Sequence, residues 1–296
     1  MHSVIAIDLG GTKLTTAVVD AAGVVLYRKK AGVARGAPEE AIAQIAGAIA
    51  DASKAAPADK PVRAVGMIVP GIYFAETGNV WLPNLWGHEQ VPLRDELQRM
   101  IGVPVVVDSD RAGYVLGERW LGVARGMDDV VFLAVGTGIG AGIVSGGRLV
   151  RGHGDIAGAV GWFTLNTEQQ EIYARVGCWE AEAAGPGLAQ RVNALSAEEV
   201  IVSARAGDAE AQRAIETTAQ YLGMGIANLV SLLNPQMIIL GGGLMQAADL
   251  FLETIKRVVI ERAQPIAANQ VRIELTALGE DAGMFGAARL ALDAEM

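Results

Sequence analysis

Cysteine and histidine are scarce in this sequence. Cys178 is the only cysteine among 296 residues, so no disulfide can form within the chain and no thiolate cluster can bind a metal. The three histidines, His2, His88 and His153, stand far apart along the chain, and an isolated histidine is more often a surface residue than a metal ligand. These absences fit a protein of the reducing cytoplasm.

Long basic runs and long apolar runs are missing as well. No long run of Lys and Arg offsets the net charge of −9, so we expect no nucleic-acid partner, which would need a basic surface. The uncharged stretch at residues 130–147 contains six glycines and predicts a hairpin rather than a membrane span. The N-terminus lacks a basic segment followed by an apolar one, so no signal peptide is expected. The prediction is a cytoplasmic protein without a membrane partner that acts on a small molecule.

The first half of the chain predicts a ribonuclease-H-like domain. A hydrophobic content of 51% over 296 residues suffices for the cores of two domains. Short apolar runs separated by glycine turns predict a three-stranded antiparallel meander, and the acids after Pro38 predict the first turn of a helix. Two buried strands with a helix between them follow. The predicted elements are strands at 4–7, 14–19, 24–27, 64–69 and 103–107, and helices from 38 and at 93–101.

The second half repeats this strand–turn–strand opening. A helix at 208–233 has one apolar stripe and ends at Asn234-Pro235. The other predicted elements are strands at 130–135, 141–144, 148–150, 237–240 and 271–275, and helices at 250–262 and 283–292. We therefore predict an α/β protein of two ribonuclease-H-like domains, residues 1–111 and 112–282, around a cleft. The segment 283–296 is expected to pack back on the first domain.

Two glycine turns stand at the heads of the two halves. Asp8-Leu-Gly-Gly-Thr-Lys13 and Gly136-Thr-Gly-Ile-Gly140 each follow an apolar strand, and small residues there let backbone N–H groups close on a phosphate. Asp8 adds a carboxylate suited to Mg²⁺. The alternative for the second turn is a dinucleotide fingerprint, but that motif opens a helix and the residues that follow predict a strand. A third turn, Gly241-Gly242-Gly243, is compatible with a ligand platform or an ordinary loop.

Seven ordered motifs together resemble the ROK family of sugar kinases and repressors, which has the actin-like ATPase fold. They are Asp8–Lys13, Pro83–Leu85, Val107–Asp110, Gly136–Gly140, Gly177–Glu180 with Gly185-Pro186, Asn234-Pro235 leading to Gly241–Gly243, and Leu278–Gly283. Because the chain begins directly with its first strand rather than with a helix-turn-helix domain, it resembles the kinase branch. The resemblance implies ATP and Mg²⁺ as cofactors, a sugar substrate and a homodimer.

The resemblance also implies a set of site residues. Asp110 would be the catalytic base, because phosphoryl transfer needs a carboxylate that orients the acceptor hydroxyl and takes its proton. The structural alternative for Asp110 is a helix N-cap. Asp108 would share its face of the strand unless the strand has already ended. The implied nucleotide-binding residues are Asp8, which would hold Mg²⁺ through water, and Gly10, Gly11, Thr12, Lys13, Gly136, Thr137, Gly138, Gly241 and Gly242. The implied substrate-binding residues are Asn84, Ser109, Asp110, Glu180 and Trp162.

Three departures from the family pattern alter the predicted sugar pocket. Ser109 stands where the family has a sugar-contacting Asn, and Ala159 and Trp162 stand where it has Glu and His. Two interpretations remain open. Either the pocket repacks and retains the usual substrate, or the indole lies over the anomeric end of the sugar and the substrate differs.

A structural zinc, which the family usually carries, is not expected. The family's cysteine positions read Glu171, Tyr173 and Cys178 here, and Trp162 replaces the histidine. One thiol among these side chains cannot complete a closed zinc site.

The predicted function is ATP- and Mg²⁺-dependent phosphoryl transfer to a hydroxyl of a hexose or hexose derivative, as in a glucokinase with an altered pocket. One alternative is a catalytically weak protein that senses a sugar or nucleotide. Another is a kinase of the same fold with a polyphosphate donor or a non-glucose acceptor. Arginines that could form a polyphosphate groove are scattered in the sequence, which disfavours that donor.

Overall fold

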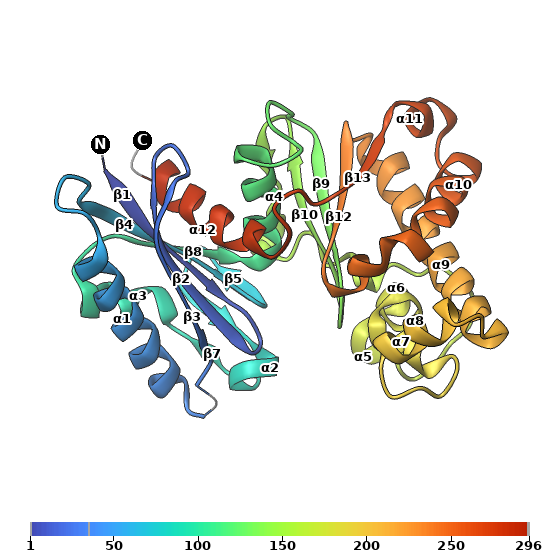
Figure 1. Cartoon of the computed structure of the whole chain (residues 1–296), viewed down its shortest axis with the longest axis horizontal. Coiled ribbons are helices and arrows are strands. Elements are labelled where there is room, and N and C mark those ends of the chain that lie inside the picture. The colour runs from blue at the N-terminus through green and yellow to red at the C-terminus, as the bar shows by residue number, and fades with distance from the viewer. Residues whose placement is uncertain (1, 35, 295–296) are drawn as a thin grey trace. The chain divides into compact units, whose positions relative to one another are not determined.

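The computed structural model describes residues 2–34 and 36–294. They form two compact units (Figure 1). The first contains the described residues up to Gly126, the segment Arg151–Ile156 and the described residues from Glu280 onward; the second contains Met127–Val150 and Ala157–Gly279. The predicted boundary between residues 111 and 112 differs from this division, because the helix that begins at Asp110 lies wholly in the first unit.

The first unit is built on a mixed sheet. Over the described residues its strand order is β3-β2-β1-β4-β8. The first three strands form the predicted antiparallel meander, and β4 and β8 run parallel to β1. The strands are β1 (Ser3–Leu9), β2 (Lys13–Asp20), β3 (Val25–Gly32), β4 (Val62–Val69) and β8 (Val105–Ser109). The helices are α1 (Pro38–Ala55), α2 (Pro83–Trp86), α3 (Leu93–Ile101), α4 (Asp110–Trp120) and α12 (Ala282–Asp293), with 3-10 turns at η1 (His153–Asp155) and η4 (Gly279–Asp281).

Strand alternation decides which helices cover each face of this sheet. Ile5 and Ile7 of β1 pack in one apolar cluster with α1 and α3, whereas Val4 and Ala6 pack in another with α12. Figure 1 shows α1 and α3 on one side of the sheet and α12 on the other. Asp8 lies two and four positions after Ala6 and Val4 on the same strand, so its side chain lies on the same face, which α12 covers.

The helices α4 and α12 pack backbone against backbone on that face. A Cβ atom on Gly286 would lie 1.9 Å from the carbonyl oxygen of Gly113, and one on Gly117 would lie 2.3 Å from that of Ala282. Any side chain at these positions would force the helices apart. This close packing explains why α4 belongs to the first unit.

A small antiparallel sheet between β4 and α3 was not predicted. It has the order β5-β6-β7 within the described residues, with β5 (Ile72–Phe74), β6 (Asn79–Trp81) and β7 (Gln90–Val91). Strands of two or three residues are too short to show a period of two in the sequence.

The second unit repeats the strand order of the first. Its sheet is β11-β10-β9-β12-β13 over the described residues, with β10 antiparallel to β9 and β12 parallel to it. The strands are β9 (Val130–Val135), β10 (Ile139–Ser145), β11 (Arg148–Leu149), β12 (Met237–Gly241) and β13 (Arg272–Leu275). The helices are α5 (Tyr173–Val176), α6 (Cys178–Ala183), α7 (Gly185–Gln190), α8 (Ala197–Arg205), α9 (Ala209–Leu233), α10 (Leu252–Arg262) and α11 (Pro265–Gln270), with 3-10 turns η2 (Val160–Trp162) and η3 (Gly243–Leu250). The predicted α/β fold with two ribonuclease-H-like halves is confirmed.

The long helix α9 shows how local sequence sets these elements. Asp208 caps its N-terminus by accepting a hydrogen bond from the backbone N–H of Ala211 at 2.8 Å. Asn234 ends it in the left-handed conformation at φ 45°. Its apolar stripe packs in the core of the second unit. Among the helices described, none combines the length and apolar character that a membrane crossing requires.

Candidate functional site

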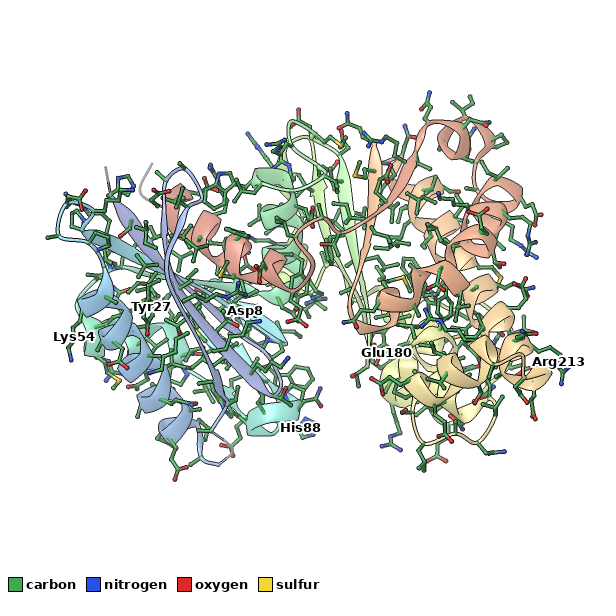
Figure 2. All side chains as sticks on the ribbon, viewed as in Figure 1. Asp8, Tyr27, Lys54, His88, Glu180 and Arg213 are labelled. Atoms are coloured by element: carbon green, nitrogen blue, oxygen red, sulfur yellow. The ribbon has the colours of Figure 1, made fainter. Side chains whose placement is uncertain are left out.

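The carboxylates of the first unit gather at one end of its sheet. Asp8 of β1 stands opposite Ile68 of β4, and Ile68 stands opposite Asp108 of β8. Adjacent strands lie about 4.8 Å apart, so the Cα atoms of Asp8 and Asp108 are about 10 Å apart. Asp110 follows as the first residue of α4. Figure 2 labels Asp8 on β1.

Burial raises the proton affinity of Asp8 and Asp110. Burial and the neighbouring charge of Asp110 raise the pKa of Asp8 to about 7, against the opposing charges of Lys30 and Arg28. Burial raises the pKa of Asp110 to about 6, although the charge and backbone N–H of Arg111 lower it. A bound cation would favour the ionised forms.

This pair fits Mg²⁺ better than a fully protein-bound metal. In the part of the chain that the structure describes, no three His, Cys, Asp or Glu side chains are grouped to hold a metal ion. Mg²⁺ usually binds through one or two carboxylates and completes its shell with water and substrate phosphates. Asp8 is therefore a suitable Mg²⁺ residue when phosphates are present.

Asp110 does not cap its helix. Ser109 is the N-cap of α4, and its Oγ accepts a hydrogen bond from the backbone N–H of Ala112 at 3.3 Å. The alternative of Asp110 as the cap is therefore wrong. Because β8 ends at Ser109, the alternation that would place Asp108 and Asp110 on one strand face does not apply. Asp110 instead accepts from the backbone N–H of Arg111 at 2.7 Å.

Tyr114 is a neighbour of both carboxylates that the sequence reasoning missed. It lies one helical turn after Asp110 on α4, so the two side chains share a face of that helix. Burial and the charges of Asp110 and Asp8 raise the pKa of its phenol well above the usual value. The spacing of four residues between Asp110 and Tyr114 was the signal in the sequence that could have identified Tyr114.

The motif before α12 has a structural role that the sequence left open. Arg28 of β3 forms a two-pronged ion pair with Asp281, and Lys30 of β3 pairs with Glu280 at 3.3 Å. A Cβ atom on Gly283 would lie 2.6 Å from Oδ2 of Asp8. The ion pairs fix the start of α12, and Gly283 leaves room there for the Asp8 carboxylate.

The first predicted phosphate turn joins β1 to β2. Gly10 donates its backbone N–H to the carbonyl of Lys13 at 2.8 Å, which closes the hairpin. Gly11, Thr12 and Lys13 are exposed, so their polar groups are accessible to a ligand. Asn84 lies on α2 with an exposed side chain.

The second predicted phosphate turn joins β9 to β10. Gly136 donates to the carbonyl of Gly138 at 2.9 Å, and Gly185 at the start of α7 donates to the carbonyl of Gly136 at 2.8 Å. Thr137 is exposed between the two strands. The dinucleotide alternative fails, because β10 follows the turn directly and no helix begins there among the described residues.

The Gly241-Gly242 turn lies beside this hairpin. Gly241 pairs with Ala134 across the parallel strands β12 and β9. Gly242 has a φ of 93°, and a Cβ atom on it would lie 2.4 Å from the carbonyl oxygen of Val135. The structure therefore brings two of the predicted nucleotide-binding turns together within the second unit.

Glu180 and Trp162 also meet in the second unit. Glu180 on α6, labelled in Figure 2, accepts a hydrogen bond from the backbone N–H of Ile139 at 2.7 Å, directly after the glycine turn. Gly161 lies against it, since a Cβ atom there would be 3.1 Å from Oε2 of Glu180. Trp162 follows at the end of η2 with 56% of its surface exposed. Burial raises the pKa of Glu180, and the Ile139 N–H opposes this shift.

A polar cluster lies around the positions where the family's zinc ligands would be. The Tyr173 hydroxyl donates to Glu182, whose other carboxylate oxygen pairs with Arg191 at 2.5 Å. Asn166 donates to the Tyr173 hydroxyl at 3.1 Å. Cys178 is buried, and its Sγ accepts from the backbone N–H of Leu165 at 3.5 Å. These side chains do not fit a closed zinc site, so the absence of zinc stays our prediction.

Three relatives of this chain differ in function. The glucokinase of Halalkalibacterium halodurans is 30% identical over 95% of this chain and 92% of its own length. The xylose repressor of Caldicellulosiruptor bescii is 30% identical over 96% of this chain and 76% of its own length. The N-acetylmannosamine kinase of Escherichia fergusonii is 30% identical over 97% of both chains.

Solved structures share the fold. The ROK hexokinase from Thermus thermophilus superposes with a TM-score of 0.86 at 30% identity and covers 99% of both chains. The ROK family glucokinase from Streptomyces griseus, in complex with glucose and AMPPNP, gives a TM-score of 0.78 at 29% identity over 98% of this chain and 99% of that one. The sequence pattern of the ROK family matches residues 4–294, and the chain therefore belongs to the ROK family.

Proposed function

We propose that this protein transfers the γ-phosphoryl group of ATP, with Mg²⁺, to a hydroxyl group of a hexose or hexose derivative. The observation that carries the proposal is the pair of desolvated carboxylates, Asp8 and Asp110, beside a glycine hairpin in the first unit. The glucokinase and N-acetylmannosamine kinase relatives support a sugar acceptor. The AMPPNP complex of the Streptomyces griseus enzyme supports ATP as donor.

Asp110 would act as the general base. Its ionised carboxylate would accept a hydrogen bond from the acceptor hydroxyl, orient it toward the phosphate and take its proton as the new bond forms. Its raised pKa increases its affinity for that proton. Asp8 would hold Mg²⁺ through water, and Mg²⁺ when bound neutralises charge on the phosphate oxygens.

Two hairpins and one turn would hold the nucleotide. Their exposed backbone N–H groups and hydroxyls suit phosphate oxygens, and the missing side chain at Gly242 would let a flat base approach the backbone. The residues we assign to this role are Gly10, Gly11, Thr12, Lys13, Gly136, Thr137, Gly138, Gly241 and Gly242.

The sugar would contact Asn84, Ser109, Asp110, Glu180 and Trp162. Glu180 already accepts the Ile139 N–H through Oε2, which leaves Oε1 to accept from a sugar hydroxyl. The exposed Trp162 indole offers a flat apolar surface for the C–H face of a sugar. Since Ala159 and Trp162 replace two polar residues of the family pattern, we propose that the preferred acceptor is not glucose.

The second candidate is a sugar-sensing protein with weak catalysis. The same two replacements favour it, as does the xylose repressor relative. An ADP-release assay on a panel of hexoses, amino sugars and N-acetyl sugars, with calorimetry of sugar and Mg-ATP binding, distinguishes the two. A kinase turns over at least one sugar and loses this activity on Asp110→Asn; saturable sugar binding without turnover on the panel would support the sensor.

A further inference from the structure

We propose that Arg151 is a positioning residue for Asp110 and that it acts through Asp108. The role of Asp110 in this inference rests on the proposed function, but the structural link does not. Arg151 comes from a distant part of the sequence, and none of the seven sequence motifs includes it.

The segment Arg151–Ile156 is anchored to the first unit by two carboxylates. Arg151 forms an ion pair with Asp108 through Nη1 and Oδ2. The backbone N–H of Ala75 in the first unit donates to Oδ2 of Asp155 at 2.9 Å. The residues on either side of this segment, Val150 and Ala157, belong to the second unit. The segment thus belongs to the first unit, although the chain on either side of it belongs to the second, and we call it the strap.

The strap contains a turn that depends on its glycines. Gly152, Gly154 and Asp155 have φ values of 69°, 65° and 61°, a conformation that most side chains rarely adopt and that glycine adopts freely. The glycines therefore allow the sharp turn that directly follows Arg151.

Asp108 links Arg151 to the start of α4. Its Oδ1 accepts the backbone N–H of Ser109 at 2.8 Å, and Ser109 caps the helix through Ala112. Asp110 is the first residue of that helix. Both oxygens of Asp108 are therefore in use, one on the strap and one on the turn that carries Asp110.

Removing Arg151 would leave the Asp108 carboxylate without its opposite charge. Asp108 is only 5% exposed, and a buried carboxylate without its partner takes up a proton or moves toward water. Either response changes the hydrogen bond to Ser109 and hence the geometry of Asp110. The Arg151 side chain is 40% exposed, so the guanidinium itself can be solvated when Asp108 is changed.

A double-mutant cycle tests the proposal. Arg151→Ala is expected to lower kcat by at least about tenfold and to leave KM for Mg-ATP within about threefold, because only the geometry of Asp110 changes. In an Asp108→Asn background the same substitution should lower kcat by less than about threefold. Arg148→Ala, an exposed arginine on β11, is the matched control and should leave kcat unchanged. Wild-type kcat in Arg151→Ala, or an equal loss in both backgrounds, would overturn the proposal.

Hydrogen exchange gives a readout that needs no sugar substrate. In Arg151→Ala the amides of residues 109–112 should exchange at least about tenfold faster, whereas Arg148→Ala leaves them protected. Asp108→Asn gives the same comparison should Arg151→Ala fail to fold. Wild-type protection of these amides would refute the link, whereas failure of the wild-type protein to phosphorylate any sugar would refute only the proposed function.

Discussion

Replacing Asp110 by Asn should inactivate the protein and stabilise it at the same time. Burial raises the pKa of Asp110 from 3.8 to about 6. A shift of roughly two pKa units corresponds to about 3 kcal/mol, as an upper value, by which the ionised carboxylate destabilises the folded state. Asn has nearly the same shape and no charge, and its oxygen can still accept the Arg111 N–H.

The size of this effect depends on pH. Since the folded-state pKa lies above the ordinary value, the destabilisation is absent below about pH 3, where the carboxyl is protonated in both states, and complete above about pH 7. Asp110→Asn should therefore gain up to about 3 kcal/mol of unfolding free energy at pH 8 and about half of that at pH 5. Urea unfolding without nucleotide measures both values.

Catalysis should change in the opposite direction. Loss of the general base should lower turnover at least about a hundredfold while Mg-ATP affinity stays close to that of the wild type. The assay is ADP release on the best acceptor of the sugar panel, with nucleotide binding followed by calorimetry.

Asp20→Asn is the matched control for stability. The hydrogen bond from Lys60 lowers the pKa of Asp20, with help from the backbone N–H groups of Val24 and Ala22, so neutralising this carboxylate should destabilise the protein at pH 8. An Asp110→Asn variant that is less stable at pH 8, or whose stability difference is the same at both pH values, would refute the desolvation argument. Wild-type turnover would refute the role as base.

Four further outcomes are expected. The kcat/KM for the acceptor should fall below about pH 6, because protonated Asp110 cannot act as a base; a flat acidic profile would contradict this. Gly286→Ala should lower stability by roughly 1–3 kcal/mol, since its Cβ would lie 1.9 Å from the Gly113 carbonyl, whereas Gly47→Ala, with open space around it on α1, should be neutral or stabilising in the same thermal melts. Elemental analysis should find no stoichiometric zinc and a chelator should leave the melting temperature unchanged; one zinc per chain would show that prediction to be wrong. Glucose should be a poor acceptor, with kcat/KM below about 10⁴ M⁻¹s⁻¹ in steady-state assays, because two polar contacts of the family pattern are replaced by Ala159 and Trp162.

The sequence by itself determined the elements that have a clear period or a local signal. The predicted strand at 130–135 and the predicted helix at 93–101 coincide with β9 and α3, because a continuous apolar run marks the strand and helical spacing marks the helix over their whole lengths. The glycine turns after β1 and β9 were also readable, since a turn of small residues between apolar strands is a local property. Asp8 and Asp110 were found through motifs.

Tertiary structure decided how those residues are used. The helix cap is Ser109 rather than Asp110, and β8 extends to Ser109, two residues beyond the predicted strand at 103–107. Two contacts join residues that are about forty positions apart in the sequence: Asp108 with Arg151, and Glu180 with Ile139. No periodicity of the sequence encodes such a pairing. The close packing of Gly286 on Gly113 likewise depends on two helices from opposite ends of the chain meeting on one sheet face. Such contacts arise only when the whole sheet has formed, because the sheet sets which distant segments meet.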